Sequence, residues 1–222
     1  MSGVTADAVI ASITRAFASP PRLDPYRHWL LDDVLPGGMA GRLAAIELPG
    51  EAIGEGGGRR ENSNDRRIFL NPTMQQRHEE CATLAAALQT PRMVGMLART
   101  CGADLDGSLL RIEYCRDRGG FWLEPHTDIG AKRLTFLIYL TTPPAGEEWG
   151  TDIYRDSAGT LVGSAPSHEN AGTAFVPAAD SWHGFAPRRI TGERRSLIIN
   201  YVGPEWRSVH ELAFADRPVA LA

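Results

Sequence analysis

Apolar positions in the first hundred residues recur at helical spacing. The first stripe consists of Ala6, Val9, Ile10, Ile13 and Phe17. It predicts one amphipathic helix, which Ser-Pro-Pro at 19–21 ends. Leu-Pro-Gly-Gly at 35–38 then opens a short helix through Met39 and Leu43. A third stripe, predicted as a single helix, consists of Met74, His78, Cys81, Leu84, Ala85 and Leu88. Thr90-Pro91 is typical of an N-cap followed by a first-turn proline, so a short fourth helix is expected through Met96 and Leu97.

From about residue 108 the pattern changes to short apolar runs. These runs cover 109–115, 134–140, 173–176 and 196–202, and clusters of Gly, Pro, Asp and Asn separate them. Such runs are typical of buried strands. Helices followed by strands, without alternation of the two, predict an antiparallel sandwich or barrel supported by helices. We therefore expect one domain over 1–222, with helical support in 1–107 and the β core in 108–203.

Composition narrows the class of protein. The 222 residues carry a net charge of −4, which argues against broad nucleic-acid binding. No apolar run approaches the roughly 20 residues of a membrane span, and the first residues do not resemble a signal peptide. The three cysteines have no disulfide or zinc-site spacing. We expect a cytoplasmic protein with no nucleic-acid or membrane partner, as a monomer or a homodimer.

Three residues of the β half are candidate metal ligands. His126 and Asp128 are two apart in a segment that precedes a buried strand, so in extended backbone both side chains address one point. His183 follows the run at 173–176. Two imidazoles and one carboxylate on one side of an ion leave other positions open, as in non-haem Fe(II) oxygenases. His-X-Asp alone is a weak signal, because such a pair also occurs on protein surfaces.

Arg194 and Ser196 add a candidate carboxylate receptor. They are two apart at the start of the run 196–202, so they share one face of a strand. A guanidinium offers paired donors to a carboxylate and the hydroxyl adds another. A buried arginine needs an anion, which is either a ligand or an internal Asp or Glu. Arg195 is the alternative for this role, although spacing favours Arg194.

The order of these motifs resembles the 2-oxoglutarate/Fe(II)-dependent dioxygenase superfamily, and most of all its prolyl-hydroxylase-type branch. The matching segments are Tyr114, Gly119-Gly120, Pro125 to Asp128, Leu134 to Leu140, Glu148 to Thr151, Thr173 to Pro177, His183 and Gly192 to Ser196. The resemblance covers about 109–203, with a weaker similarity at 26–36. It implies a double-stranded β-helix, a cupin-like jelly roll, with N-terminal helical support.

The resemblance also implies the site. His126, Asp128 and His183 would ligate Fe(II), and Arg194 and Ser196 would bind the distal carboxylate of 2-oxoglutarate. Tyr114 would contact a cosubstrate carboxylate, or Tyr139 in its place. With O₂ as the other cosubstrate, such enzymes release succinate and CO₂ and hydroxylate an unactivated C–H bond. Related halogenases have a small residue at the carboxylate position, which leaves room for a halide. Because this chain has Asp128 there, the resemblance implies hydroxylation and not halogenation.

The substrate side of the site is less defined. Phe121, Trp122 and Trp149 are candidates for an apolar part of the substrate pocket, although aromatic residues are also common in cores. The glycine- and arginine-rich segment 54–67 is either a solvated loop or a lid whose Arg59, Arg60, Arg66 or Arg67 contacts an anionic substrate group. We expect a small-molecule substrate, such as an amino acid or a biosynthetic intermediate, carrying a carboxylate or other anion if the second interpretation holds.

Three other functions remain open at this point. The chain is alternatively a hydroxylase of peptide or protein side chains, which a long exposed groove would indicate. A cupin-like sensor would bind the metal and 2-oxoglutarate without turnover. The same ligands also suit Zn²⁺ in a hydrolase, but such an enzyme has no need for a receptor of a diacid.

Overall fold

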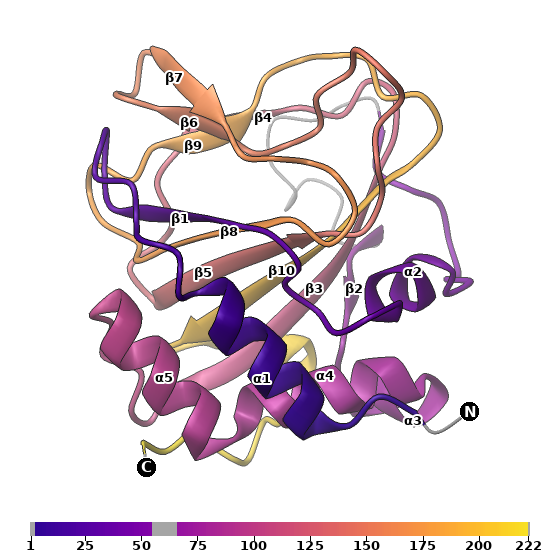
Figure 1. Cartoon of the computed structure of the whole chain (residues 1–222), viewed down its shortest axis with the longest axis vertical. Coiled ribbons are helices and arrows are strands. Elements are labelled where there is room, and N and C mark those ends of the chain that lie inside the picture. The colour runs from indigo at the N-terminus through magenta and orange to yellow at the C-terminus, as the bar shows by residue number, and fades with distance from the viewer. Residues whose placement is uncertain (1–2, 55–65, 222) are drawn as a thin grey trace.

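Two antiparallel sheets face each other, and helices cover the outer side of the larger sheet (Figure 1). The structure, a computed structural model, describes residues 3–54 and 66–221. Its helices are α1 (Ala6–Ala16), α2 (Met39–Ala44), α3 (Pro72–Arg77), α4 (Glu79–Gln89), α5 (Pro91–Cys101) and the short 3₁₀ helix η2 (Val209–Glu211). None of the helices in the described residues is long and apolar enough to cross a membrane.

Local signals account for the helix ends. Thr5 caps α1 by accepting a hydrogen bond from the amide of Ala8, and Thr90 caps α5 in the same way. Gly102 ends α5 in the left-handed conformation, which glycine adopts without strain. The third predicted helix is wrong in one respect. His78 has extended backbone angles and divides the stripe into α3 and α4, which the apolar spacing cannot reveal because both helices bury side chains in one core.

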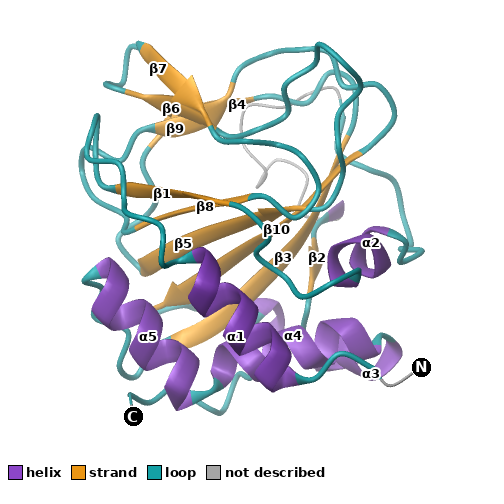
Figure 2. Cartoon of the chain, viewed as in Figure 1, coloured by secondary structure: helices purple, strands orange, loops and turns teal. Residues whose placement is uncertain are grey.

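The strands form a six-stranded and a four-stranded sheet (Figure 2). The larger sheet has the order β1 (His28–Leu31), β8 (Gly172–Phe175), β5 (Lys132–Tyr139), β10 (Arg194–Val202), β3 (Leu109–Asp117), β2 (Ile68–Phe69). The smaller sheet has the order β4 (Leu123–His126), β9 (His183–Phe185), β6 (Asp152–Tyr154), β7 (Leu161–Ser164). From β3 to β10 the chain passes back and forth between the sheets, which is the double-stranded β-helix, or jelly roll, that we expected.

The N-terminal half contributes more than helices. Its strands β1 and β2 form the two edges of the larger sheet, and neither was predicted as a strand. Short strands such as β2, with two residues, carry too little pattern to be recognised in sequence. The four predicted strands correspond to β3, β5, β8 and β10.

The two faces of the larger sheet differ in chemistry. On the outer face, side chains such as Ile112, Phe136 and Ile199 join the helices in one apolar core. On the inner face, β3 and β10 carry buried polar residues, among them Arg111, Glu113 and Asn200. Buried polar groups are retained where they find partners or a ligand, so the candidate site lies between the sheets.

Candidate active site

The two candidate histidine ligands are a cross-strand pair. His126 is the last residue of β4 and His183 the first of β9, and the register places them directly opposite each other. Directly paired residues of an antiparallel ladder project to the same side, and the two rings lie 4.3 Å apart between centroids. Asp128 follows two residues later. The ligand atoms of all three side chains lie within 4.8 Å of one another.

Both histidines are held in the tautomer that binds a metal. The Nδ1 atom of His126 lies 2.8 Å from the carbonyl oxygen of Glu124, and that of His183 lies 2.9 Å from the carbonyl oxygen of Ser181. A carbonyl only accepts, so each Nδ1 carries the hydrogen and each Nε2 keeps a lone pair. Burial lowers the pKa of His183 to about 4, which keeps this ring neutral near pH 7.

Asp128 supplies the negative charge of the set. Its side chain is 3% exposed, and its two oxygens contact Lys132 and Thr135. Burial raises the pKa of Asp128, but the nearby ammonium of Lys132, His183 and the hydroxyl of Thr135 together hold it below its ordinary value. Two imidazoles and one carboxylate therefore converge on one point, a donor set that fits Fe(II).

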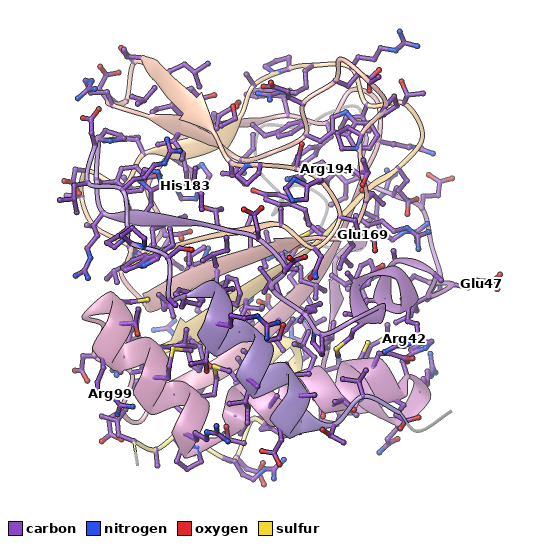
Figure 3. The ribbon with its side chains drawn as sticks, viewed as in Figure 1. Arg42, Glu47, Arg99, Glu169, His183 and Arg194 are labelled. Atoms are coloured by element: carbon purple, nitrogen blue, oxygen red, sulfur yellow. The ribbon has the colours of Figure 1, made fainter. Side chains whose placement is uncertain are left out.

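A cavity of about 370 Å³ extends from the three ligands along β10. Arg194, Ser196 and Ile198 line it at alternate positions of this strand. Figure 3 shows Arg194 and His183 in the space between the two sheets. The Ser196 hydroxyl is fully buried and has no hydrogen-bond partner among the described residues. An orphaned buried hydroxyl beside a guanidinium fits the carboxylate of a bound diacid.

Arg194 already has an internal anion. Its Nη1 donates to Asp117 at 2.5 Å and its Nε donates to the carbonyl of Trp149 at 2.6 Å. The sequence left open whether the anion beside Arg194 is a ligand or an internal Asp or Glu. The structure contains an internal one, Asp117. Arg195 points to the other side of the strand, where it binds Glu193 and the carbonyl oxygens of Ala44 and Ile46. Of these two arginines, only Arg194 lines the cavity.

The two candidate tyrosines lie in different places. Tyr114 projects from the outer face of β3, where its hydroxyl donates to the carbonyl of Leu43 at 2.7 Å. Tyr114 therefore packs in the core with the helices and does not line the cavity, and its contact with the cosubstrate stays a prediction. Tyr139 lies on the inner face with its ring near Arg194, but its hydroxyl donates to Thr151 at 2.8 Å. Thr151 itself lines the cavity.

Only some of the candidate substrate residues line the cavity. Phe121 and Arg67 line the cavity, and Arg67 forms a two-point ion pair with Glu113. Trp149 does not line the cavity; it is buried in an apolar cluster with Phe121, and its indole nitrogen donates to the backbone carbonyl of Arg189. Trp122 lines a separate pocket together with Tyr154 and Pro187.

The arginine-rich segment is only partly described. Arg66 lies within 4.0 Å of Glu51 and is not among the residues that line the cavity. Arg59 and Arg60 lie outside the described residues, so the role of the segment 54–67 stays a prediction.

Several polar residues of the site were missed in the sequence. Thr135 and Asn200 lie within otherwise apolar strands, and Arg111 alternates with apolar residues of β3. A polar side chain within a predicted buried strand is a usable signal, since it indicates that the strand faces something polar.

No protein-family model matches the sequence, and no curated protein matches it. Solved structures are similar at low identity. A prolyl 4-hydroxylase from Phytophthora capsici matches with a TM-score of 0.60 and 16% identity, over 91% of this chain and 67% of that one. A prolyl hydroxylase from Trichoplax adhaerens, solved with a hypoxia-inducible-factor peptide, matches with a TM-score of 0.57 and 11% identity, over 89% and 90%. SnoN, the α-ketoglutarate-dependent epimerase of nogalamycin biosynthesis, matches with a TM-score of 0.51 and 16% identity, over 89% and 84%.

These likenesses show the fold. The chain has the jelly-roll fold of the 2-oxoglutarate/Fe(II) dioxygenase superfamily, as its motifs indicated. The similar proteins include one in complex with a peptide fragment and one from nogalamycin biosynthesis. The substrate class therefore has to be argued from the cavity itself.

Proposed function

We propose that this chain is an Fe(II)- and 2-oxoglutarate-dependent dioxygenase that hydroxylates a C–H bond of a small molecule. The observation that carries the proposal is the cavity in which two kinds of site meet. At one end, two histidines present Nε2 lone pairs beside the Asp128 carboxylate. At the other end, the orphaned Ser196 hydroxyl lies beside Arg194. A metal centre and a receptor for a diacid in one cavity are what this reaction requires.

The chain's own residues would divide the work as follows. His126, Asp128 and His183 would hold Fe(II) on one side and leave the other side accessible from the cavity. Arg194 and Ser196 would orient 2-oxoglutarate by its distal carboxylate. When bound, the iron and 2-oxoglutarate supply the oxidising chemistry with O₂, yielding succinate and CO₂. Apolar walls, including Leu137, Ile198 and Phe185, would exclude water from the reacting centre.

The size of the cavity supports a small substrate. About 370 Å³ is at the lower end of the range for sites that enclose small molecules, and 2-oxoglutarate would occupy part of it. Arg67 and Lys132 on its wall are each paired with a carboxylate, Glu113 and Asp128 respectively. We therefore propose a small molecule, such as an amino acid or a biosynthetic intermediate, as the substrate.

The proposal is tested with the purified full chain. Fe(II) and 2-oxoglutarate added without oxygen should give the visible charge-transfer band of a chelated keto acid. His126→Ala should abolish the band, whereas the matched control His168→Ala, at an exposed histidine, should retain it. An iron-loaded wild-type protein that stays colourless with 2-oxoglutarate would contradict the proposal.

The substrate is sought in the same preparation. Succinate release, with detection of products that gain one oxygen atom, would be followed across a library of metabolites and a library of peptides. Stimulation by a metabolite supports the small-molecule proposal. Stimulation by peptides alone would contradict it and favour a peptide hydroxylase.

A further inference from the structure

A chain of buried hydrogen bonds leads to the candidate metal ligand Asp128 from across the larger sheet. Thr135 on β5, Asn200 on β10 and Arg111 on β3 are directly opposite one another in the register of three neighbouring strands (Figure 1). All three are at most 2% exposed. Arg111 Nη1 lies 2.9 Å from Asn200 Oδ1, Asn200 Nδ2 lies 3.0 Å from Thr135 Oγ1, and Thr135 Oγ1 lies 2.5 Å from Asp128 Oδ2.

The chemistry of the groups sets the direction of this chain. A guanidinium can only donate, so the amide oxygen of Asn200 must face Arg111. The amide nitrogen then faces Thr135 and donates to its oxygen. A hydroxyl has one hydrogen, and with its oxygen accepting from Asn200 that hydrogen points to Asp128. Every link is thus oriented by the one before it, beginning at Arg111.

Arg111 is itself fixed firmly enough to begin the chain. Its Nε donates to Glu211 at 2.5 Å and its Nη2 to Glu113 at 2.8 Å. Its guanidinium also lies over the rings of Phe69 and Trp206, at 4.8 and 5.3 Å. Two carboxylates balance the buried cation, and two rings restrict its plane.

We propose that Thr135 and Asn200 are positioning residues that hold the Asp128 carboxylate in the orientation in which it binds the metal. This inference rests on the metal site of the proposed function. Lys132 contacts the other carboxylate oxygen, but its side chain is 19% exposed on a flexible stem. Thr135 is buried and β-branched, so its hydroxyl has few alternative positions. The hydroxyl therefore restricts the orientation of the carboxylate more than the ammonium does.

Metal affinity tests the proposal without requiring turnover. The full chain, stripped of metal with a chelator, is titrated with Mn(II), and the free ion is followed by electron paramagnetic resonance. Thr135→Val keeps the shape of the side chain and removes the hydroxyl. We expect it to weaken Mn(II) binding by about tenfold or more, as for other partners of metal ligands. Thr135→Ser, which restores a hydroxyl, should return the affinity close to that of the wild type.

A second variant and a control separate positioning from general stability. Asn200→Ala leaves the Thr135 hydroxyl in place but free to turn, so its affinity should lie between those of the wild type and Thr135→Val. Thr173→Val is the matched control. It removes another buried threonine hydroxyl of the same sheet, which donates to the carbonyl of Trp29 at 3.0 Å. It should lower the unfolding temperature without changing Mn(II) affinity.

The outcomes distinguish this inference from the proposed function. Equal Mn(II) affinities of the wild type, Thr135→Val and Asn200→Ala overturn the positioning role alone. A missing charge-transfer band with Fe(II) and 2-oxoglutarate overturns the proposed function alone. A wild-type protein that binds no Mn(II) overturns the metal site and both proposals with it.

Discussion

Arg194 and Asp117 form a buried ion pair across β10 and β3, where the register places them directly opposite each other. The Asp117 side chain is fully buried and that of Arg194 is 5% exposed. The guanidinium that is the candidate clamp for 2-oxoglutarate is thus compensated before any ligand binds. This arrangement keeps the arginine in place, since an uncompensated buried cation is strongly destabilising.

Asp117→Asn should make the thermal stability of the protein more dependent on bound 2-oxoglutarate. The amide removes the compensating charge, so the unfolding temperature falls in the absence of ligand. Bound 2-oxoglutarate then supplies a carboxylate beside Arg194, and its stabilising effect should be larger than in the wild type. Thermal unfolding with Mn(II), with and without 2-oxoglutarate, measures both shifts. Equal ligand-induced shifts in the two proteins would argue against Arg194 as the clamp.

Ser196→Ala should lower affinity for 2-oxoglutarate without lowering stability. The hydroxyl has no partner among the described residues, so its removal leaves none of them unsatisfied. A hydrogen bond to a carboxylate contributes about 1.5–3 kcal/mol, or roughly 10- to 150-fold in affinity. Quenching of protein fluorescence by 2-oxoglutarate measures the affinity, and thermal unfolding measures the stability. A large loss of stability with unchanged affinity would show that Ser196 is structural.

Tyr114→Phe should have the opposite effects. Its hydroxyl donates to the carbonyl of Leu43, next to the end of α2, on the side of the sheet away from the cavity. We expect a loss of about 1 kcal/mol in the free energy of unfolding and an unchanged KM for 2-oxoglutarate. Denaturant unfolding and cosubstrate kinetics measure the two. An increase in KM would restore the cosubstrate role that the resemblance implied.

The contrast between Ser196 and Tyr114 shows what the sequence could and could not predict. A spacing of two residues was sufficient to predict that Arg194 and Ser196 lie on the same face, because both belong to one strand and side chains alternate between the faces of a strand. For Tyr114 the deciding fact is which face of β3 points inward. In this sheet the apolar face lies under the helices, and the charged residues Arg111 and Glu113 on the other face line the cavity. The alternation along β3 already places Tyr114 on the face opposite these charges, but which of the two faces borders the cavity depends on the packing of the helices.

The three candidate metal ligands could be proposed from the sequence for a related reason, but the residues that hydrogen-bond to Asp128 could not. His126 and Asp128 are close in sequence, so local geometry brings them together. The pairing of His126 with His183 depends on the β4–β9 register, which spacing along the chain does not reveal. The chain from Arg111 to Asp128 joins three strands whose order in the sheet cannot be obtained from spacing within any one of them.

Glu193 offers a test by pH at a place outside the cavity. Its carboxylate accepts hydrogen bonds from Arg116 at 3.0 and 3.1 Å and from Arg195 at 2.7 Å. The same two arginines donate to backbone carbonyls of residues 44–50, so Glu193 fixes the groups that hold this segment. Partial burial raises the pKa of Glu193, but the two guanidinium groups lower it more, and it lies below its ordinary value of 4.5.

Glu193→Gln should therefore destabilise the protein near pH 7 and not in acid. A carboxyl whose pKa is depressed by folding stabilises the folded state above its unfolded pKa, and this contribution is lost as the pH falls through the folded pKa. We expect a loss of about 1–3 kcal/mol near pH 7, measured by denaturant unfolding, which shrinks below pH 4.5. Glu47→Gln, at an exposed side chain of the same segment, is the control and should have little effect at either pH. A difference between Glu193→Gln and the wild type that stays constant down to low pH would mean that shape, and not charge, explains the role of Glu193.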